Sequence, residues 1–344
     1  MIMNRIVEED VSVFAKDFAL SGQLMKSTFL VTGATGLIGS SLIRCLLALD
    51  EQIKIYAPVR NLKKAEALFD EWQKEYIQFV ECDLVEYDYG LLEKIDYIVH
   101  CAAPTSSKFF VEHPVETSEI IVDGTKKMLQ LARQKQVKGM VYLSSLEVYG
   151  ELHDDSCPIK EDFQGYLNPM SVRSSYPMAK RATENLCCLY SSEYGVPVKI
   201  ARLTQTTGAG IAKDDSRIIA QFARLAAQGR DIVLHTTGES ARPYCYVTDS
   251  VSALLYVLLK GTSGECYNVA NESTYISARG MAEYIHEHIN PNSQVRVELA
   301  DNMGYAPPTK LRLDTKKLKD LGWQPRYGLK EIYERLIKYL KSFD

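Results

Sequence analysis

The residues Thr28-Phe-Leu-Val-Thr-Gly-Ala-Thr-Gly-Leu-Ile-Gly39 decide the fold of this chain. The β-branched apolar run at 28–32 predicts a strand, and the apolar segment 40–49 predicts a helix. Between them, Gly33 permits a tight turn, Gly36 lets the backbone approach a pyrophosphate, and Gly39 allows the helix to pack against the strand. The N–H groups at the start of the helix would face the anion. At the first junction of an α/β chain, this pattern predicts a dinucleotide-binding turn; a purely structural turn is the alternative.

Downstream, short β-branched runs alternate with amphipathic segments of helix length. The runs expected to form strands are 28–32, 53–59, 77–82, 97–101, 140–144 and 197–203. This alternation is typical of a parallel sheet with right-handed crossover helices on both faces. We expect an α/β fold with a Rossmann-like, doubly wound parallel sheet, whose ligands bind beyond the carboxyl ends of the strands.

Three regions are expected along the chain. Residues 1–26 form a helical extension, residues 27–205 form a Rossmann domain that binds NAD or NADP, and residues 206–344 form mainly a smaller substrate-binding lobe. The pattern of the last region is irregular, with helices near 217–228, 248–260 and 277–289. We expect this lobe to be interleaved with the last elements of the sheet.

The composition limits the partners and the compartment. The formal net charge is -4 and Lys and Arg are scattered, so no nucleic-acid surface is expected. Acidic residues such as Glu8 and Asp10 interrupt the first 26 residues, so neither a signal peptide nor a membrane helix is expected there. The 8 cysteines contain no C-x-x-C pair and stand in apolar stretches. We therefore expect reduced core cysteines in a cytoplasmic protein and no metal, with a zinc site ranked far below.

The end of the second expected strand bears on the choice between NAD and NADP. An acidic residue there normally binds the adenosine ribose, but this strand ends Ala57-Pro-Val-Arg60. Arg60 would instead face a 2′-phosphate and favour NADP, although a surface arginine is common at such a position. Asp83, after the third strand, is placed to meet the adenine or simply to cap a turn. The choice stays open.

Tyr176 and Lys180 are the candidate acid/base pair. They stand at the head of the segment 177–194, which predicts a long helix with proline in its first turn. At a spacing of four, both side chains lie on one face of the helix. A tyrosine that acts as a base near neutral pH needs its pKa lowered by roughly 3 units, and a neighbouring ammonium supplies a shift of that sign. Because structural pairs share this spacing, the assignment needs a third element.

The segment 140–150 supplies that element. It predicts a strand that delivers Ser144, Ser145 and Glu147 to the carboxyl end of the sheet. Hydroxyls there could merely cap backbone groups. Beside the glycine turn and the Tyr/Lys pair, however, they would donate a hydrogen bond to the oxygen of an alcohol being oxidised. Together the three elements predict a redox enzyme.

With these elements in place, the chain from about residue 27 onward resembles the extended short-chain dehydrogenase/reductases, the superfamily of NAD-dependent sugar-nucleotide epimerases, dehydratases and decarboxylases. The resemblance rests on the glycine turn, His100-Cys-Ala-Ala103, Ser144 to Gly150, Tyr176-x-x-x-Lys180, Arg242 to Asp249 and Leu321-Gly-Trp-Gln-Pro325. It implies that Tyr176 is the acid/base, that Lys180 binds the nicotinamide ribose and lowers the pKa of Tyr176, and that Ser145 binds the sugar oxygen. It further implies the cofactor-binding set Gly33, Thr35, Gly36, Leu37, Ile38, Gly39, Arg60, Asp83, Leu84, Ala102, Ala103, Tyr176 and Lys180.

Within this superfamily the motifs look most like those of the UDP-glucuronate decarboxylases. The segment 100–107, His113-Pro114, Gly124-Thr125 and Arg173 carry this likeness. Decarboxylases and dehydratases have a glutamate at the position of Glu147, which implies a catalytic role. The dehydratases also place an aspartic acid beside it, where this chain has Leu146. An epimerase or a decarboxylase is therefore favoured over a dehydratase.

The same resemblance implies a site for a nucleotide-diphosphate sugar. Arg242 would clamp the diphosphate through a bidentate guanidinium. Gln205 stands where the family usually has asparagine, so its amide reaches one methylene further. The expected substrate-binding set is Ser106, Ser107, Arg173, Gln205 and Arg242. A homodimer packed through the helices near 114–135 and 177–194 is also suggested.

The expected reaction starts with hydride transfer from sugar C4 to bound NAD(P)+ while Tyr176 removes the hydroxyl proton, which gives a 4-keto intermediate. Epimerisation, loss of a C5 carboxylate or elimination across C5 and C6 can follow. An NADPH-dependent reductase of a 4-keto sugar nucleotide is one alternative, favoured by Arg60. A non-catalytic dinucleotide-binding regulator is another, and its expected sign would be a missing Tyr, Lys or Ser.

Overall fold

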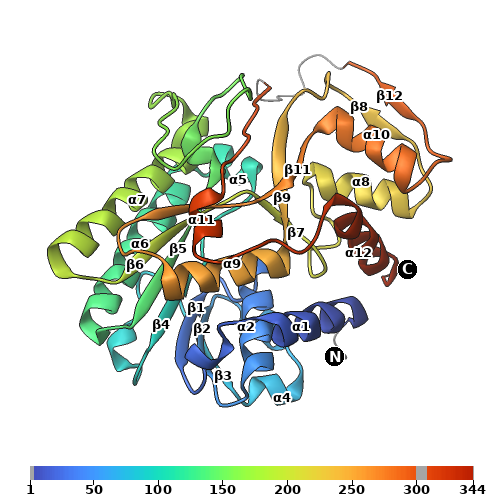
Figure 1. Ribbon diagram of the computed structural model, residues 1–344. Coiled ribbons are helices and arrows are strands. Elements are labelled where there is room, and N and C mark those ends of the chain that lie inside the picture. Colours follow the sequence, from blue (N-terminus) through green and yellow to red (C-terminus); the bar gives the residue numbers. More distant parts are fainter. Residues whose placement is uncertain (1–3, 300–307, 344) are drawn as a thin grey trace.

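A seven-stranded sheet forms the centre of the computed structural model, which describes residues 4–299 and 308–343 (Figure 1). In spatial order the strands are β3 (Ile77–Glu81), β2 (Lys54–Val59), β1 (Thr28–Thr32), β4 (Tyr97–His100), β5 (Gly139–Ser145), β6 (Val198–Leu203) and β10 (Cys266–Val269). Every neighbouring pair in this sheet is parallel. The predicted doubly wound α/β fold is confirmed.

Helices bury both faces of this sheet. Phe29 and Val31 point into one core, which includes side chains of α2 (Leu37–Leu49) and α9 (Val247–Lys260). Leu30, between them, points into the other core, which includes α6 (Pro114–Lys135) and α7 (Ser175–Tyr194). Two buried faces explain why the strands are almost continuously apolar instead of alternating with polar residues.

The strand order reverses beside β1. The chain moves outward through β2 and β3 and then returns to pair β4 with the other side of β1. Because all seven strands are parallel, their carboxyl ends share one edge, and ligands of such sheets bind where the order reverses. The segments after β1 and β4 therefore meet at the expected binding edge.

A second, smaller lobe lies to one side of the large sheet (Figure 1). It holds a three-stranded sheet of β7 (Gln205–Thr207), β9 (Ala241–Tyr246) and β11 (Asn271–Ser277), a two-stranded sheet of β8 (Ile232–Leu234) and β12 (Val295–Val297), and the helices α8 (Ile218–Ala227), α10 (Ala278–His288) and α12 (Leu329–Lys341). Between these elements the chain returns to the large sheet as α9 and β10. The two parts are thus interleaved in sequence.

The N-terminal segment forms the helix α1 (Arg5–Asp17) and a short 3-10 turn, η1 (Ser21–Gln23), while residues 1–3 of the predicted extension lie outside the described residues. Asn4 caps α1 by accepting the N–H of Ile6. The helix packs against α2, α9 and α12. Its buried Asp10 accepts the Tyr246 hydroxyl at 2.5 Å and pairs with Arg335 at 3.0 Å. α1 therefore contacts both the large sheet's helices and the small lobe.

Two local expectations differ from the structure. The segment 140–150 is not one strand, since β5 ends at Ser145 and 146–149 form the 3-10 turn η3 (Leu146–Tyr149). All eight cysteines are unpaired, but Cys157 and Cys188 are exposed, so the prediction of core cysteines is wrong for these two. Cys188 faces away from its buried neighbour Cys187 because adjacent residues on a helix point in different directions.

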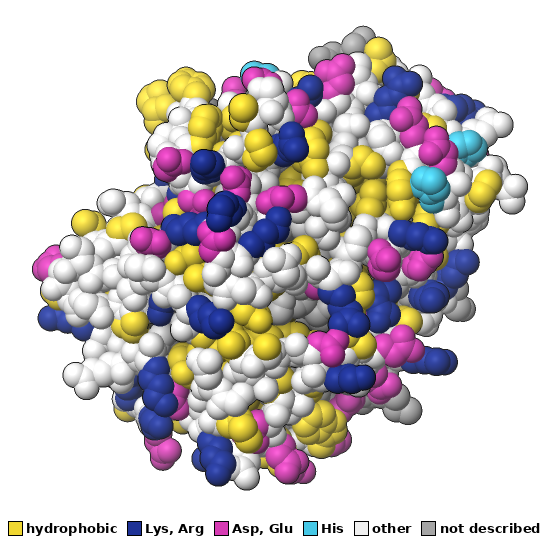
Figure 2. Space-filling model, in the orientation of Figure 1, with side chains coloured by type: hydrophobic (Ala, Val, Ile, Leu, Met, Phe, Trp, Pro, Cys, Tyr) yellow, Lys and Arg dark blue, Asp and Glu magenta, His cyan; other side chains and the backbone are white. Residues whose placement is uncertain are grey.

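The remaining short elements connect the main ones. They are α3 (Leu62–Glu66), α4 (Glu71–Lys74), η2 (Tyr89–Leu91), α5 (Ser107–Glu112), η4 (Val172–Ser174) and α11 (Lys316–Asp320). None of the helices described here has the length and apolar character needed to cross a bilayer. Figure 2 shows positive and negative side chains intermingled over one face of the molecule.

Candidate active site

The glycine turn connects β1 to α2 beside the reversal of strand order. Gly33 has a φ of 69°, and a Cβ added to it would lie 2.9 Å from the backbone nitrogen of Ala102. A Cβ added to Gly39 would lie 2.8 Å from the carbonyl carbon of Gly33. Backbone atoms cannot yield to such contacts, so both positions require glycine. Gly36 is exposed and forms the N-cap of α2, with no side-chain cap in front of the helix.

These features fit a bound dinucleotide. The exposed backbone at Gly36 and the N-terminus of the 13-residue helix α2 offer N–H groups to a pyrophosphate, and Thr35, Leu37 and Ile38 complete the turn. After β4, the N–H of Ala102 donates to Thr32 Oγ1 at 3.1 Å, which fixes this loop against the turn. Ala103 follows it and is half-buried. The residues present can therefore hold NAD or NADP across the switch point.

The residues expected near the adenosine share this edge of the sheet. Arg60 directly follows β2 and is exposed, and Asp83 follows β3 and is also exposed. One oxygen of Asp83 accepts the N–H of Val85 at 2.8 Å, so this carboxylate does cap a turn. Leu84 is half-buried against Gly124, where an added Cβ would lie 2.9 Å from Leu84 Cδ2. The adenosine-binding roles of Arg60, Asp83 and Leu84 stay predictions.

Tyr176 and Lys180 lie in the first two turns of α7 and are almost wholly buried. The Tyr176 ring stacks on Phe110 of α5, with ring centroids 4.3 Å apart and an angle of 9°. Lys180 Nζ lies 5.7 Å from the centre of the Tyr176 ring and donates to the Leu143 carbonyl at 2.6 Å. The helix thus presents both groups to the carboxyl end of β5.

Burial shifts the pKa values of Tyr176 and Lys180 in the directions that favour the uncharged side chains. The pKa of Tyr176 is raised well above its usual range by burial and then by Glu147, while Ser145 and Arg173 lower it. Burial lowers the pKa of Lys180 to about 7, and Glu184 opposes this shift. The direction for Tyr176 is opposite to the expected one because burial of the phenol disfavours the charged phenolate. A positive nicotinamide would supply the missing charge.

The loop after β5 adds the other predicted catalytic groups. Ser144 Oγ is buried and has no hydrogen-bond partner within residues 4–299 and 308–343, while Ser145 Oγ accepts the N–H of Glu147 at 3.2 Å. The Glu147 carboxylate pairs with Arg173 at 3.0 Å. The Arg173 guanidinium carbon lies 5.3 Å from the centre of the Phe110 ring. Five predicted residues, Ser145, Glu147, Arg173, Tyr176 and Lys180, therefore come together around one point.

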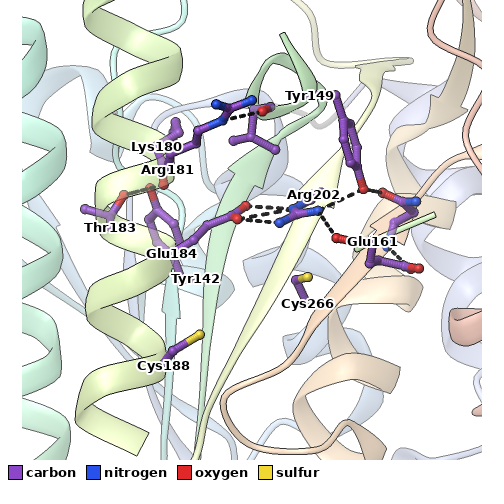
Figure 3. A network of polar contacts seen from close by, with 12 residues as sticks. Tyr142, Tyr149, Glu161, Lys180, Arg181, Thr183, Glu184, Cys188, Arg202 and Cys266 are labelled. Carbon is purple, nitrogen blue, oxygen red and sulfur yellow. Dashed lines mark hydrogen bonds and ion pairs between the residues drawn. The ribbon is translucent and has the colours of Figure 1, made fainter. Parts of the chain in front are cut away.

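A buried polar network is centred on Arg202 of β6 (Figure 3). Glu184 lies one turn after Lys180 on α7. Its carboxylate accepts hydrogen bonds of 2.7, 2.9 and 3.2 Å from the Arg202 guanidinium of β6. Arg202 also donates to the Tyr149 hydroxyl at 3.0 Å and to the Glu161 carbonyl at 2.7 Å. Tyr149 in turn donates to Asn268 at 2.6 Å. The network links the catalytic helix, β6, β10 and the loops around them.

The other expected substrate residues are Gln205, Arg242, Ser106 and Ser107. Gln205 and Arg242 belong to the small three-stranded sheet, and the buried Gln205 Oε1 has no partner among the residues described. Ser106 caps α5 and Ser107 begins it, and both are exposed. No hydrogen bond or ion pair joins these four residues to Tyr176 in the described part of the chain. Their roles stay predictions.

Two contributors were missed from the sequence. Glu184 follows Lys180 at the same spacing of four that singled out the Tyr/Lys pair, so that spacing could have indicated it. Phe110 gave no signal, because an apolar residue in a short helix is ordinary. Its stacking on Tyr176 depends on how α5 packs against α7.

The fold and this site together define a dinucleotide-dependent enzyme of the tyrosine–lysine–serine type. The comparison with family models agrees, since residues 29–270 match the model described as "NAD dependent epimerase/dehydratase family". The chain belongs to this family. The predicted family, the predicted class of enzyme and the predicted nicotinamide cofactor are confirmed. α1 and the segment from residue 271 onward, which includes β11, α10, β12 and α12, lie outside the matched range.

Curated relatives and solved structures narrow the likeness. The chain is 32% identical over 307 residues to "UDP-glucuronic acid decarboxylase 5" of Arabidopsis thaliana, covering 88% of this chain and 86% of that protein. It is 28% identical to "UDP-glucuronic acid decarboxylase 1" of Danio rerio, covering 91% of this chain and 72% of that one. In fold it is similar to a UDP-glucose 4-epimerase of Thermotoga maritima with UDP-glucose (TM-score 0.79, 22% identity, 92% of this chain and 99% of that one). It is also similar to a UDP-glucuronic acid 4-epimerase of Bacillus cereus with UDP-glucuronic acid and NAD (TM-score 0.77, 20% identity, 92% and 100%).

Proposed function

We propose that this chain oxidises C4 of a UDP-hexuronic acid and releases its carboxylate as carbon dioxide, the reaction of the decarboxylases named above. The observation that carries this proposal is the grouping of Tyr176, Ser145 and Lys180 with Glu147, which has Leu146 and no second acid beside it. A dehydration needs a proton donor for the leaving hydroxyl, whereas loss of carbon dioxide needs none. The decarboxylase of Arabidopsis thaliana, which this chain matches over 86% of that protein's length, supports the same reaction.

In this mechanism the chain's residues manage the proton and the position of the sugar. A nicotinamide dinucleotide held at the glycine turn of Gly33, Gly36 and Gly39 would supply the hydride acceptor and donor for C4. Ser145 holds the C4 oxygen and Tyr176 accepts its proton, which produces a C4 ketone. The bond from C5 to the carboxyl carbon then breaks, and its electron pair moves into the C4 carbonyl as an enolate. A solvent proton added at C5 gives the 4-keto pentose, and Tyr176 returns its proton to the C4 oxygen when C4 is reduced again.

The test is product analysis by mass spectrometry after incubation with UDP-glucuronic acid, UDP-galacturonic acid, UDP-glucose and dTDP-glucose. Loss of carbon dioxide from a uronic acid supports the proposal. Loss of water from a neutral hexose contradicts it. Replacing Tyr176 with Phe should cut turnover by about 10²- to 10⁴-fold and leave cofactor binding intact, since a phenyl ring keeps the stacking on Phe110.

A second candidate is 4-epimerisation of a UDP-hexuronic acid. The fold similarity to the Bacillus cereus enzyme with UDP-glucuronic acid and NAD favours it, and it needs the same Tyr176, Lys180 and Ser145. A product of unchanged mass with an inverted C4 would establish it. Consumption of added NADPH by a 4-keto sugar nucleotide would instead support the reductase alternative.

We also propose a homodimer formed through α6 and α7. These helices contact each other on one face of the large sheet. Apolar side chains remain exposed on them, including Val115, Leu189 and Tyr194. Light scattering after size-exclusion chromatography should give twice the chain mass, and Leu189→Glu should shift it toward one chain mass.

A further inference from the structure

We infer that Arg173 selects a sugar that carries a carboxylate, by exchanging its ion pair with Glu147 for one with the C6 carboxylate of the substrate. The inference rests on the proposed function only in taking a nucleotide hexuronic acid as the substrate. It assigns Arg173 as a specificity-determining residue and Glu147 as its resting partner.

The side chains of the Glu147–Arg173 ion pair can separate easily. Its side chains are 33% and 40% exposed, and a single contact of 3.0 Å joins them. A guanidinium has five N–H donors arranged as a fork that suits a carboxylate. The contact with Glu147 uses one of its terminal nitrogens, so donors remain for a second carboxylate. The pair can therefore be shared or exchanged at little cost.

The pair also stands where a substrate carboxylate must come. Glu147 and Arg173 both lie close enough to Tyr176 to shift its pKa, in opposite directions. A sugar whose C4 hydroxyl meets Tyr176 and Ser145 carries C6 only two bonds from C4. The C6 carboxylate therefore falls within reach of the charges that surround Tyr176.

Among these charges, Arg173 is the one suited to receive an anion. Lys180 is 3% exposed and donates to the Leu143 carbonyl, so it faces inward. Glu147 repels a second carboxylate unless a cation lies between them. Arg173 is 40% exposed, and its guanidinium carbon lies 5.3 Å from the centre of the Phe110 ring, which also stacks on Tyr176. The stack thus positions the guanidinium relative to the reacting hydroxyl.

Exchange has a second consequence for Glu147. Once Arg173 turns to the substrate, the Glu147 carboxylate loses its counter-ion beside the bound sugar. A neutral hexose offers no carboxylate, so the resting pair stays closed around it. Binding of a uronic acid should therefore respond to changes at Glu147 and Arg173, whereas binding of a neutral hexose should not.

The test measures dissociation constants by calorimetry in the Tyr176→Phe background with NAD bound, so that turnover does not disturb binding. Arg173→Met should weaken UDP-glucuronic acid by about 10- to 100-fold, the range for losing a hydrogen bond to a charged group, and should change UDP-glucose by less than about 3-fold. Glu147→Gln should tighten UDP-glucuronic acid and leave UDP-glucose unchanged. This gain cannot come from a damaged fold. The matched control is Arg133→Met, since Arg133 also lies over an aromatic ring, Tyr194, at 3.8 Å but is far from the site.

Equal weakening of both ligands by Arg173→Met would overturn the inference, because Arg173 would then hold the nucleotide or the loop. Weaker binding of UDP-glucuronic acid to Glu147→Gln would overturn the exchange. Failure of the proposed function is a separate outcome, in which the unmodified enzyme releases no carbon dioxide whatever the dissociation constants are.

Discussion

Two glutamate–arginine ion pairs lie at the catalytic helix α7, and they differ in burial and in the number of hydrogen bonds that join them. In the Glu184–Arg202 pair the side chains are 10% and 7% exposed, and three contacts of 2.7 to 3.2 Å join them. The remaining donors of Arg202 go to the Tyr149 hydroxyl and the Glu161 carbonyl. In the Glu147–Arg173 pair the side chains are a third or more exposed and share one contact. The same two residue types thus form a buried ion pair with several hydrogen bonds in one place and a partly exposed ion pair with one contact in the other.

The difference follows from solvent. A buried charge must find all of its partners within the protein, since removing one partner leaves a charge without water or counter-ion. An exposed charge can replace its partner with water or with a ligand at small cost. We therefore expect the buried pair to matter for folding and for the position of Lys180, and the open pair to matter for the substrate.

Glu184→Ala gives the largest expected effect. It leaves Arg202 buried without its carboxylate and should lower the free energy of unfolding by about 3–5 kcal/mol. Glu147→Ala should change it by less than about 1 kcal/mol, because Arg173 can turn to water. Urea unfolding followed by circular dichroism measures both. Similar losses for the two variants would show that the pairs do not differ as described.

Replacing both members of the buried pair gives a smaller effect. The double variant Glu184→Leu, Arg202→Met removes both charges, so it should recover much of the loss seen with Glu184→Ala. A deficit of about 1–3 kcal/mol should remain, since the Tyr149 hydroxyl and the Glu161 carbonyl lose a donor. Unfolding midpoints of the single and double variants give the coupling directly. An additive double variant would show that the charges do not depend on each other.

The sequence predicts the strand, the glycine turn and the helix that form the site, but not the difference between the two ion pairs. The strand at 28–32 and the glycine turn after it follow from local rules, because each strand is buried on both faces and each glycine serves one close approach. The helix with Tyr176 and Lys180 follows from spacing. In contrast, the 3-10 turn at 146–149 was not predicted, because apolar residues recur up to Tyr149 and the turn depends on packing.

The two pairs are indistinguishable in sequence for a physical reason. Glu184 and Arg202 are 18 residues apart, and Glu147 and Arg173 are 26 apart, so neither pairing is local. Which pair is buried depends on how α7, β6 and the loop at 159–161 close over Arg202. The raised pKa of Tyr176 was missed for the same reason, since it follows first from burial of the phenol.

The smallest expected effect is a shift in pH profile, and it separates the roles of the two glutamates. Glu184 raises the pKa of Lys180, whereas Glu147 raises that of Tyr176. Because the pKa of Lys180 lies below that of Tyr176, the limb of the kcat/KM profile near pH 7 follows Lys180 and the limb at high pH follows Tyr176. Glu184→Gln should therefore lower the pKa of Lys180 below about 7 and move the limb near pH 7 to lower pH. Glu147→Gln should lower the pKa of Tyr176 and move the high-pH limb instead.

Stability gives an independent measure of the same shift. The folded pKa of Lys180, about 7, lies below its ordinary value of 10.5, so the unfolded chain binds more protons between these values. Unfolding free energy should therefore fall as the pH drops from about 10.5 toward about 7, and Glu184→Gln should extend this fall below pH 7. Glu147→Gln should leave the slope in this window unchanged, because its carboxylate acts on Tyr176. If both variants moved the same limb of the profile, the two pairs would share one electrostatic role, and the buried one would not be specific to Lys180.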